Sequence, residues 1–240
     1  MPTTLSNRLV RILQVVYRRV RYGYWEPIEA NLEAFLKTTL LASHSINIIQ
    51  VGANDGVTHD LVYPFLQEKM LHRAVLVEPL PEAFSRLRSL HQGNPKITLE
   101  NVAISATPGS VTMYTVDDEN RVTTFDSKIS SLDRAHLEKF IEYDPRIASV
   151  IREEKVQSDT IANVICRNEM LKLDLLCIDA EGYDYEILKI VPWESCDIRA
   201  VFYEQAHLGH EGRVASYRLL RSMGFRLYQH GRDVLGIRSG

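Results

Sequence analysis

Cysteine is scarce in this chain of 240 residues, and long apolar runs are missing. The three cysteines, Cys166, Cys177 and Cys196, form no Cys-x-x-Cys pair, which argues against a disulfide scaffold or a zinc knuckle and favours a reducing cytoplasm. No stretch approaches the ~18 uninterrupted apolar residues of a membrane-spanning helix. Arginines also interrupt every apolar segment near the N-terminus, unlike in a signal peptide. We therefore expect a cytoplasmic protein that is soluble or touches only a membrane surface.

An excess of one charge is also lacking. The chain has 28 Lys and Arg residues against 31 Asp and Glu, a net charge of -3, which argues against nucleic acid as a partner. Five of the arginines lie within residues 1–25, which hold no acid, so the remaining chain carries 23 basic and 31 acidic residues. Leu5 to Val20 would form an amphipathic helix with its arginines opposite the apolar face. Residues 5–21 would then either dock on their own domain or contact an anionic membrane.

A helical extension over residues 1–42 is expected, with a second helix at Ile28–Leu41. From residue 43 to residue 240 short apolar runs alternate with helical patterns, which predicts one Rossmann-like, doubly wound α/β domain with a mostly parallel sheet. The expected strands are Ile46–Val51, Ala74–Val77, Ile97–Ile104, Leu173–Ile178, Ile198–Tyr203 and a hairpin of Phe225–Tyr228 with Val234–Ile237. The expected helices are Asp60–Met70, Pro81–His91, Tyr185–Ile190 and Val214–Met223.

Two segments interrupt this alternation. Val111–Val116 follows a Thr-Pro-Gly turn and is expected to pair with the end of strand Ile97–Ile104 as a hairpin. Asp117–Lys155 is polar and charged, with a helix expected from Leu132 to Tyr143. This insert is either a lid that selects the substrate or an ordinary surface excursion.

A glycine turn and an acid follow the first two strands of the predicted sheet. Gly52-Ala53-Asn54-Asp55-Gly56 ends the first strand, and Glu78 ends the second. In doubly wound sheets ligands bind beyond the carboxyl ends of the strands, and a carboxylate there can accept hydrogen bonds from ribose hydroxyls. The pair therefore favours a cofactor of the adenosine type over a purely structural turn with a helix-capping acid.

Acids and a histidine follow two further strands. Asp179 and Glu181 come after the fourth strand, and Glu204 and His207 come after the fifth. A carboxylate or an imidazole at this edge can accept a proton as general base. The same groups are also metal ligands in kind, but their spacing matches no ligand motif, so no metal site is predicted. His210 is expected to be an exposed loop histidine.

Five segments follow one another along the chain: INIIQVGANDG, VLVEPLPEAFSRLR, NVAISATPGSVTMY, LDLLCIDAEGYDYEILK and VFYEQAHLG. In this order they resemble the FkbM-type family of class I S-adenosylmethionine-dependent methyltransferases. The resemblance covers roughly residues 45–240 and implies a seven-stranded sheet. It also implies methyl transfer from S-adenosylmethionine, often to a hydroxyl group of a sugar, glycan or natural product.

The resemblance implies a cofactor site as well. The turn from Gly52 to Gly56, with Asn54 and Asp55, would surround the methionine part, and Glu78 with Pro79 would hold the ribose. The adenine would lie at Asn101, Val102 and Ala103, and Asp179 would face the sulfonium. Gln50 stands where the family commonly has an acid, which removes a charge attraction for the cofactor's amino group.

Transfer to an aliphatic hydroxyl requires a base, because such a hydroxyl is not ionised near neutral pH. The candidates are His207, Glu204, Asp179 and Glu181, of which His207 and Glu204 are favoured. Three other functions remain open: a metal-assisted O-methyltransferase, an NAD-dependent oxidoreductase and a non-catalytic module on a membrane surface. The expected partner is a small-molecule or glycan acceptor, and the sequence does not predict an oligomeric state.

Overall fold

The structure is a computed structural model that describes residues 26–27, 36, 45–57, 60–116 and 130–238. The predicted amphipathic helix at 5–21 lies outside these residues, as does Ile28–Leu41 except for Leu36, which is helical and fully buried. The boundary between an extension and a catalytic domain at residue 42 therefore stays a prediction. Among the described residues, no helix combines the length and apolar character needed to cross a membrane.

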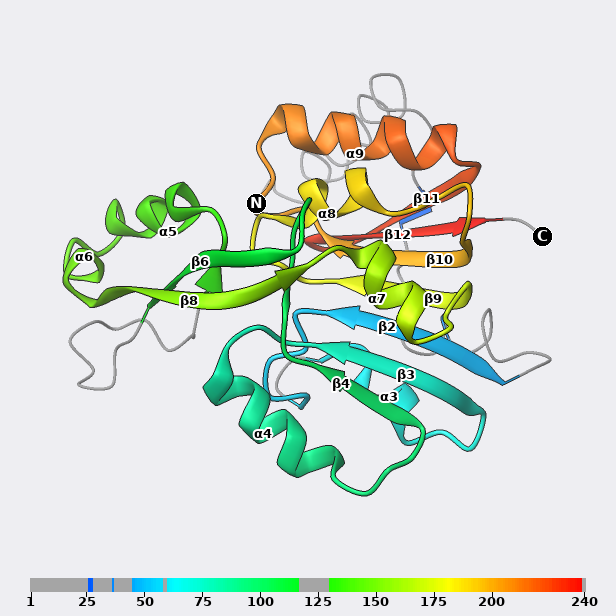
Figure 1. The fold of residues 1–240 in the computed structure, drawn as a ribbon. Helices are drawn as coiled ribbons and strands as arrows, with labels where there is room; N and C mark the ends of the chain where they lie inside the picture. Colours follow the sequence, from blue (N-terminus) through cyan, green and yellow to red (C-terminus); the bar gives the residue numbers. More distant parts are fainter. Residues whose placement is uncertain (1–25, 28–35, 37–44, 58–59, 117–129, 239–240) are drawn as a thin grey trace, which may run out of the picture.

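The main sheet confirms the predicted Rossmann-like α/β class (Figure 1). Its seven longer strands match the predicted number, and a two-residue strand, β1, adds an eighth at the edge within the described part of the chain. Strand β12 is antiparallel to both of its neighbours, whereas the other neighbouring strands are parallel. In spatial order the strands are β1 (Glu26–Pro27), β11 (Phe225–His230), β12 (Asp233–Arg238), β10 (Asp197–Glu204), β9 (Lys172–Ile178), β2 (Ile46–Val51), β3 (Leu71–Val77) and β4 (Ile97–Glu100).

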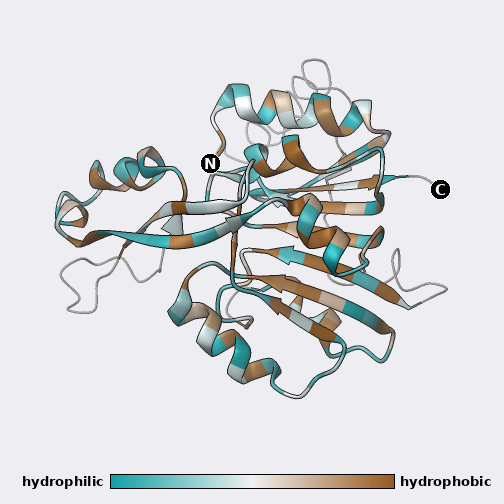
Figure 2. Ribbon diagram, viewed as in Figure 1, coloured by the Kyte–Doolittle hydropathy of each residue, from teal (hydrophilic) through white to brown (hydrophobic). Residues whose placement is uncertain are grey.

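Helices cover both faces of this sheet because its central strands are apolar on both sides. Ile49 and Val51 of β2 belong to a buried cluster with α7 (Ile161–Arg167), α8 (Asp184–Ile190) and α9 (His210–Ser222). Ile46 and Ile48 face the opposite cluster, formed with α3 (Tyr63–Leu66), α4 (Pro81–His91) and Leu36. Figure 2 shows the central strands as mostly hydrophobic, whereas the helices alternate in character. Continuous apolar strands of this kind are typical of parallel sheets buried on both faces.

One predicted helix is shorter than expected. Within Asp60–Met70 only α3 is helical. At its start the side-chain carboxylate of Asp60 accepts hydrogen bonds from the backbone amides of Val62 at 2.6 Å and Tyr63 at 3.2 Å. After α3 the chain turns, and the Leu71 amide donates to the Glu68 carbonyl as β3 begins. The side chain of Asp60 is thereby fixed beside the end of β2.

A second sheet of four strands projects from the main sheet (Figure 1). Its order is β5 (Ala103–Ile104), β8 (Ile151–Asp159), β6 (Gly109–Val116) and β7 (Ser130–Ser131), and it carries α5 (Arg134–Ile141) and α6 (Ile147–Val150). The predicted hairpin was wrong, because β8 lies between β5 and β6. The predicted strand Ile97–Ile104 is likewise divided between the two sheets, as β4 and β5.

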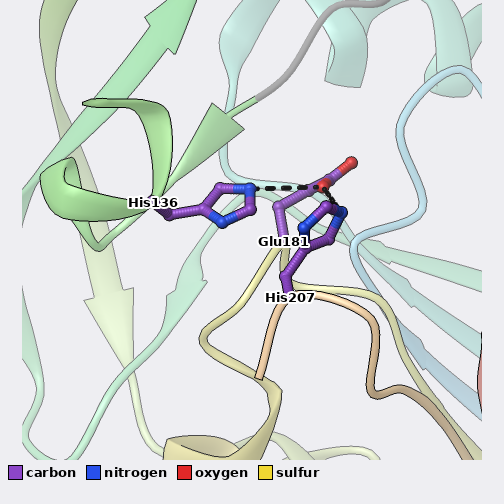
Figure 3. A group of neighbouring side chains, drawn as sticks. All are labelled: His136, Glu181 and His207. Carbon is purple, nitrogen blue, oxygen red and sulfur yellow. Dashed lines mark ion pairs between the residues drawn. The ribbon is translucent and has the colours of Figure 1, made fainter. Parts of the chain in front are cut away.

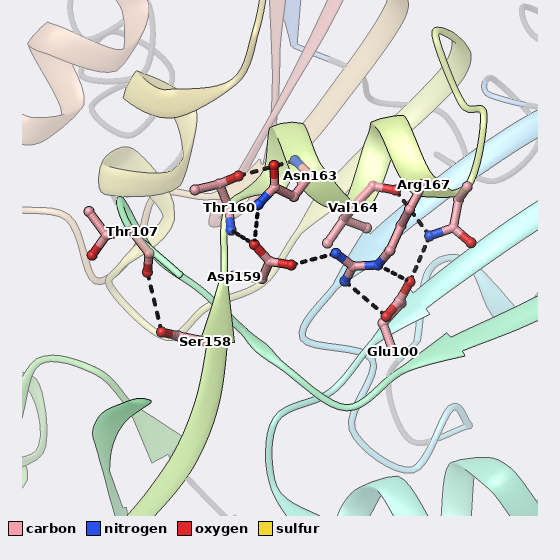
Figure 4. A network of polar contacts seen from close by, with 9 residues as sticks. Glu100, Thr107, Ser158, Asp159, Thr160, Asn163, Val164 and Arg167 are labelled. Carbon is pink, nitrogen blue, oxygen red and sulfur yellow. Dashed lines mark hydrogen bonds and ion pairs between the residues drawn. The ribbon is translucent and has the colours of Figure 1, made fainter. Parts of the chain in front are cut away.

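A polar network joins the two sheets (Figure 4). The guanidinium of Arg167 in α7 donates to both carboxylate oxygens of Glu100, at 2.8 and 2.9 Å, and also to Asp159. Glu100 ends β4 in the main sheet, and Asp159 ends β8 in the second sheet. The bidentate geometry of an arginine with a carboxylate fixes orientation as well as position. The network therefore sets how the second sheet leaves the main sheet.

Candidate active site

The predicted site residues meet at one edge of the main sheet. Strands β10, β9, β2 and β3 are adjacent and parallel, so their carboxyl ends lie together. Gly52 follows β2, Glu78 follows β3, Asp179 follows β9, and Glu204 ends β10. This edge is where ligands bind in doubly wound sheets.

The backbone approaches closely at Gly52. Its φ of +81° is left-handed, and its amide donates to the carbonyl of Val77 at 2.9 Å. A Cβ added at this position would lie 1.8 Å from the carbonyl oxygen of Asp179. Since no side chain tolerates such a distance, only glycine allows the ends of β2 and β9 to come together here.

The carboxylate of Glu78 is buried and held in place by the backbone. Its side chain accepts hydrogen bonds from the amides of Asn54 at 2.8 Å and Leu80 at 2.9 Å, and the residue is only 4% exposed. Burial raises the pKa of Glu78 to about 7, although these two hydrogen bonds lower it in part. A carboxylate has about four acceptor positions, so two remain for donors of a ligand.

The residues around Glu78 shape the neighbouring loops. Asn101 donates its side-chain amide to the carbonyls of Glu78 at 2.8 Å and Pro79 at 3.0 Å. Val102 packs against the core as a half-buried residue, and Ala103 is buried at the start of β5. Asn101 therefore lies next to Glu78, and a contact of Asn101, Val102 and Ala103 with adenine stays a prediction.

The turn after Gly52 is also held by local contacts. Asp55 accepts a hydrogen bond from the amide of Val57 at 3.0 Å, and Asn54 has a left-handed φ of 47°. At Gly56 an added Cβ would lie 2.6 Å from a methyl group of Leu87. Helix α4 therefore packs directly against the turn and fixes its position.

An acid that the sequence did not single out lies beside Gln50. The Gln50 side-chain amide donates to Asp60 at 3.0 Å. The remaining oxygens, Oε1 of Gln50 and Oδ2 of Asp60, are buried and have no hydrogen-bond partner among the described residues. Burial raises the pKa of Asp60. Asp60 thus places a carboxyl group beside Gln50, which itself has none. Oε1 of Gln50 and Oδ2 of Asp60 are two buried acceptors that can each take a hydrogen bond from a donor.

The three acids after β9 differ in environment. Asp184 is fully buried and accepts hydrogen bonds from the amides of Ala180 at 3.4 Å and Gly182 at 3.1 Å, so it closes the loop structurally. Burial, and then the charge of Glu181, raise the pKa of Asp179 to about 7. Glu181 has a left-handed φ of 48°, and its carbonyl accepts a hydrogen bond at 2.8 Å from the hydroxyl of Ser131 in the second sheet.

Glu204 and His207 lie beside these acids. The Nε2 atom of His207 is 3.4 Å from Glu204 and 3.5 Å from Glu181, and Arg232 lies 3.1 Å from Glu204. Burial, with the neighbouring Asp179, raises the pKa of Glu204 to about 8. Burial, followed by the charge of His136, lowers the pKa of His207 to about 4. His210 is exposed, as expected, but it is the first residue of α9 and does not lie in a loop.

His136 was not identified from the sequence, although it completes this group (Figure 3). It comes from α5 in the insert, and its ring lies 4.3 Å from the ring of His207 and points toward Glu181. No motif marks it, because only folding brings the insert over the carboxyl end of β9. The insert is thus more than a surface excursion, since it supplies Ser131 and His136 to the site.

Comparison with solved structures finds the fold of this chain in methyltransferase FkbM from Methylobacillus flagellatus KT. Methyltransferase FkbM from Methylobacillus flagellatus KT is 13% identical, with a TM-score of 0.50 over 80% of this chain and 43% of that chain. The METTL16 MTase domain is 10% identical, with a TM-score of 0.48 over 99% of this chain and 83% of that chain. Human methyltransferase 10 domain containing protein is 11% identical, with a TM-score of 0.46 over 100% of both chains. The chain therefore spans less than half the length of the first of these. No curated protein matches it significantly.

A family model decides the relationship. Residues 50–227, well over half of the chain, match the model described as the Methyltransferase FkbM domain. The matched region begins at Gln50 and includes the strand ends that carry Gly52, Glu78 and Asp179 as well as the second sheet. The chain belongs to the FkbM methyltransferase domain family.

Proposed function

We propose that this protein transfers a methyl group from S-adenosylmethionine to a hydroxyl group of a sugar, glycan or natural product. The observation that carries the proposal is the buried carboxylate of Glu78 beside the close turn at Gly52, in a chain whose family implies this methyl donor. The cofactor supplies a methyl group on a cationic sulfonium. An edge rich in carboxyl groups favours a cation of this kind.

The residues present fit such a cofactor. Glu78 keeps two acceptor positions for ribose hydroxyls, since its other two are used by backbone amides. The buried unpartnered oxygens of Gln50 and Asp60 suit a donor such as an ammonium group. Gly52 allows the backbone to approach the ligand, and Asp179 lies at the neighbouring strand end.

Proton transfer is assigned to Glu204 or His207. As a bond forms between the acceptor oxygen and the methyl carbon, the carbon–sulfur bond breaks and the hydroxyl proton passes to a base. Glu204 ends β10 and His207 lies in the loop after it. The Nε2 atom of His207 is 3.5 Å from Glu181, and Asp179 is close enough to Glu204 to raise its pKa. The insert that carries His136 is placed over these groups, so we propose that it contributes to acceptor selection.

Separate Glu204→Gln and His207→Gln variants test the assignment of the base. Loss of the proton acceptor should lower turnover by about 10²- to 10⁴-fold, while the dissociation constant of S-adenosylmethionine changes little. Turnover is measured as release of S-adenosylhomocysteine with a panel of sugar and polyol acceptors, and His210→Ala serves as the control. Full turnover in both variants would show that the base lies elsewhere.

A further inference from the structure

We propose that His136, Glu181 and His207 bind one divalent transition-metal ion of the zinc type. The three residues come from α5, from the loop after β9 and from the loop after β10, and one ligand atom of each lies within 4.8 Å of the others (Figure 3). Two imidazoles and a carboxylate are a donor set that suits zinc and related metals better than magnesium or calcium.

The burial of His136 without hydrogen-bond partners among the described residues points to a ligand. The residue is only 1% exposed, and neither of its ring nitrogens has a hydrogen-bond partner among the described residues. Buried polar atoms are usually satisfied, so an imidazole with two unsatisfied nitrogens needs an explanation. Its Nε2 atom is aimed at Glu181, 3.7 Å from a carboxylate oxygen (Figure 3). A metal between the two groups would satisfy this nitrogen.

The two distances that end at Glu181 fit a shared ion better than direct hydrogen bonds. The Glu181 oxygen lies 3.7 Å from His136 and 3.5 Å from His207, and hydrogen bonds between nitrogen and oxygen rarely exceed about 3.2 Å. Two ligand atoms at about 2.0–2.2 Å from a tetrahedral ion are about 3.4 Å apart. Both edges that end at Glu181 are therefore close to the separation expected of ligands of one ion.

His207 carries the lone pair that a metal ligand needs. A nitrogen of the Arg232 guanidinium lies 2.9 Å from Nε2 of His207. Because a guanidinium only donates hydrogen bonds, this Nε2 must be the acceptor. Arg232 occupies the direction that the ion requires, but its side chain is 66% exposed and can turn into solvent. Arg232 is thus a competitor of the metal rather than part of its site.

The backbone of Glu181 has an unusual, left-handed conformation. Its left-handed φ of 48° is uncommon for a residue other than glycine, and such conformations gather at functional sites. The hydroxyl of Ser131 holds the Glu181 carbonyl, and Asp184 holds the amide of the next residue, Gly182. The loop therefore presents the Glu181 side chain to His136 from a fixed backbone.

Three protein ligands leave a coordination position open for water or a substrate oxygen. If the proposed methyl transfer holds, this position would receive the acceptor hydroxyl, and Glu204 rather than His207 would take the proton. That role rests on the proposed function, whereas the metal site itself does not. The test therefore measures metal binding without cofactor or acceptor.

Calorimetric titration of the chelator-treated protein with zinc chloride tests the site. We expect one zinc ion per chain with micromolar or tighter affinity, and no comparable binding of magnesium chloride. His136→Phe keeps an aromatic ring against Phe140, and Glu181→Gln keeps the side-chain shape. Each variant should weaken zinc binding by at least about tenfold because it removes one ligand. His210→Ala, a nearby histidine outside the group, should bind zinc like the wild type.

Arg232→Ala gives a result in the opposite direction. Since it removes a competing cation, this variant should bind zinc at least as tightly as the wild type. The proposal is overturned if the wild type binds no zinc, if magnesium binds more tightly, or if zinc binding is weakened in Arg232→Ala. Unchanged affinity in His136→Phe or Glu181→Gln also overturns it, provided that the variant unfolds at the wild-type temperature. If His136→Phe does not fold, Glu181→Gln decides.

Discussion

Gly52→Ala is expected to abolish S-adenosylmethionine binding and to lower the free energy of unfolding by about 3 kcal/mol or more. The added Cβ would lie 1.8 Å from the carbonyl oxygen of Asp179, which belongs to the backbone and cannot rotate away. The ends of β2 and β9 would have to separate, and the cofactor site lies at that junction. Calorimetry with S-adenosylmethionine and urea unfolding measure the two effects.

Gly93→Ala is the matched control for this substitution. Gly93 has nearly the same backbone conformation, with a φ of +85° against +81° at Gly52, but no atom lies within 4 Å of an added Cβ. Only the cost of a left-handed alanine applies there, about 1 kcal/mol, and cofactor binding should be unchanged. Equal effects of the two substitutions would show that close packing at Gly52 is not what the site requires.

Glu78→Gln is expected to weaken S-adenosylmethionine binding by about 10- to 100-fold. Hydrogen bonds to a charged group contribute about 1.5–3 kcal/mol. The side-chain amide of the glutamine would also place a donor group opposite the backbone amides of Asn54 and Leu80, which are donors themselves. Glu82→Gln removes an exposed carboxylate from the nearby α4 and should leave the dissociation constant unchanged. A wild-type dissociation constant in Glu78→Gln would remove Glu78 from the cofactor site.

Binding through Glu78 should also depend on pH. Burial raises its pKa to about 7, so the free protein holds the carboxylate form mainly above that value. Ribose hydroxyls donate to the carboxylate, and cofactor affinity should therefore fall as the pH drops. The dissociation constant should be about tenfold higher at pH 6 than at pH 8, and Glu78→Gln should lose this part of the dependence.

The elements that the sequence predicts best are those with strong local signals. The apolar run Ile46–Val51 and the helix Pro81–His91 have the predicted bounds, because a glycine turn ends the first and a proline begins the second. Glu78, Asp179 and Glu204 lie at strand ends, where parallel topology necessarily brings them together. The gathering of the main site at one edge thus followed from strand order alone.

The second sheet could not be predicted in the same way. Strand β8 contains Arg152, Glu153 and Lys155, and polar and apolar residues do not alternate regularly along its sequence. Asp60 and His136 were missed for a related reason. Each reaches the site through tertiary packing, Asp60 through its hydrogen bond with Gln50 and His136 through the docking of the insert, and neither lies in a recognisable motif.

We propose that the edge around Glu78 and Gly52 binds S-adenosylmethionine. Calorimetric titration of the wild-type protein with S-adenosylmethionine, S-adenosylhomocysteine and NAD at pH 8 tests this binding. We predict one site per chain for each of the two adenosyl compounds, weakened by Glu78→Gln, and no binding of NAD. Binding of NAD without binding of either adenosyl compound would show that this edge does not hold a methyl donor and would favour an oxidoreductase.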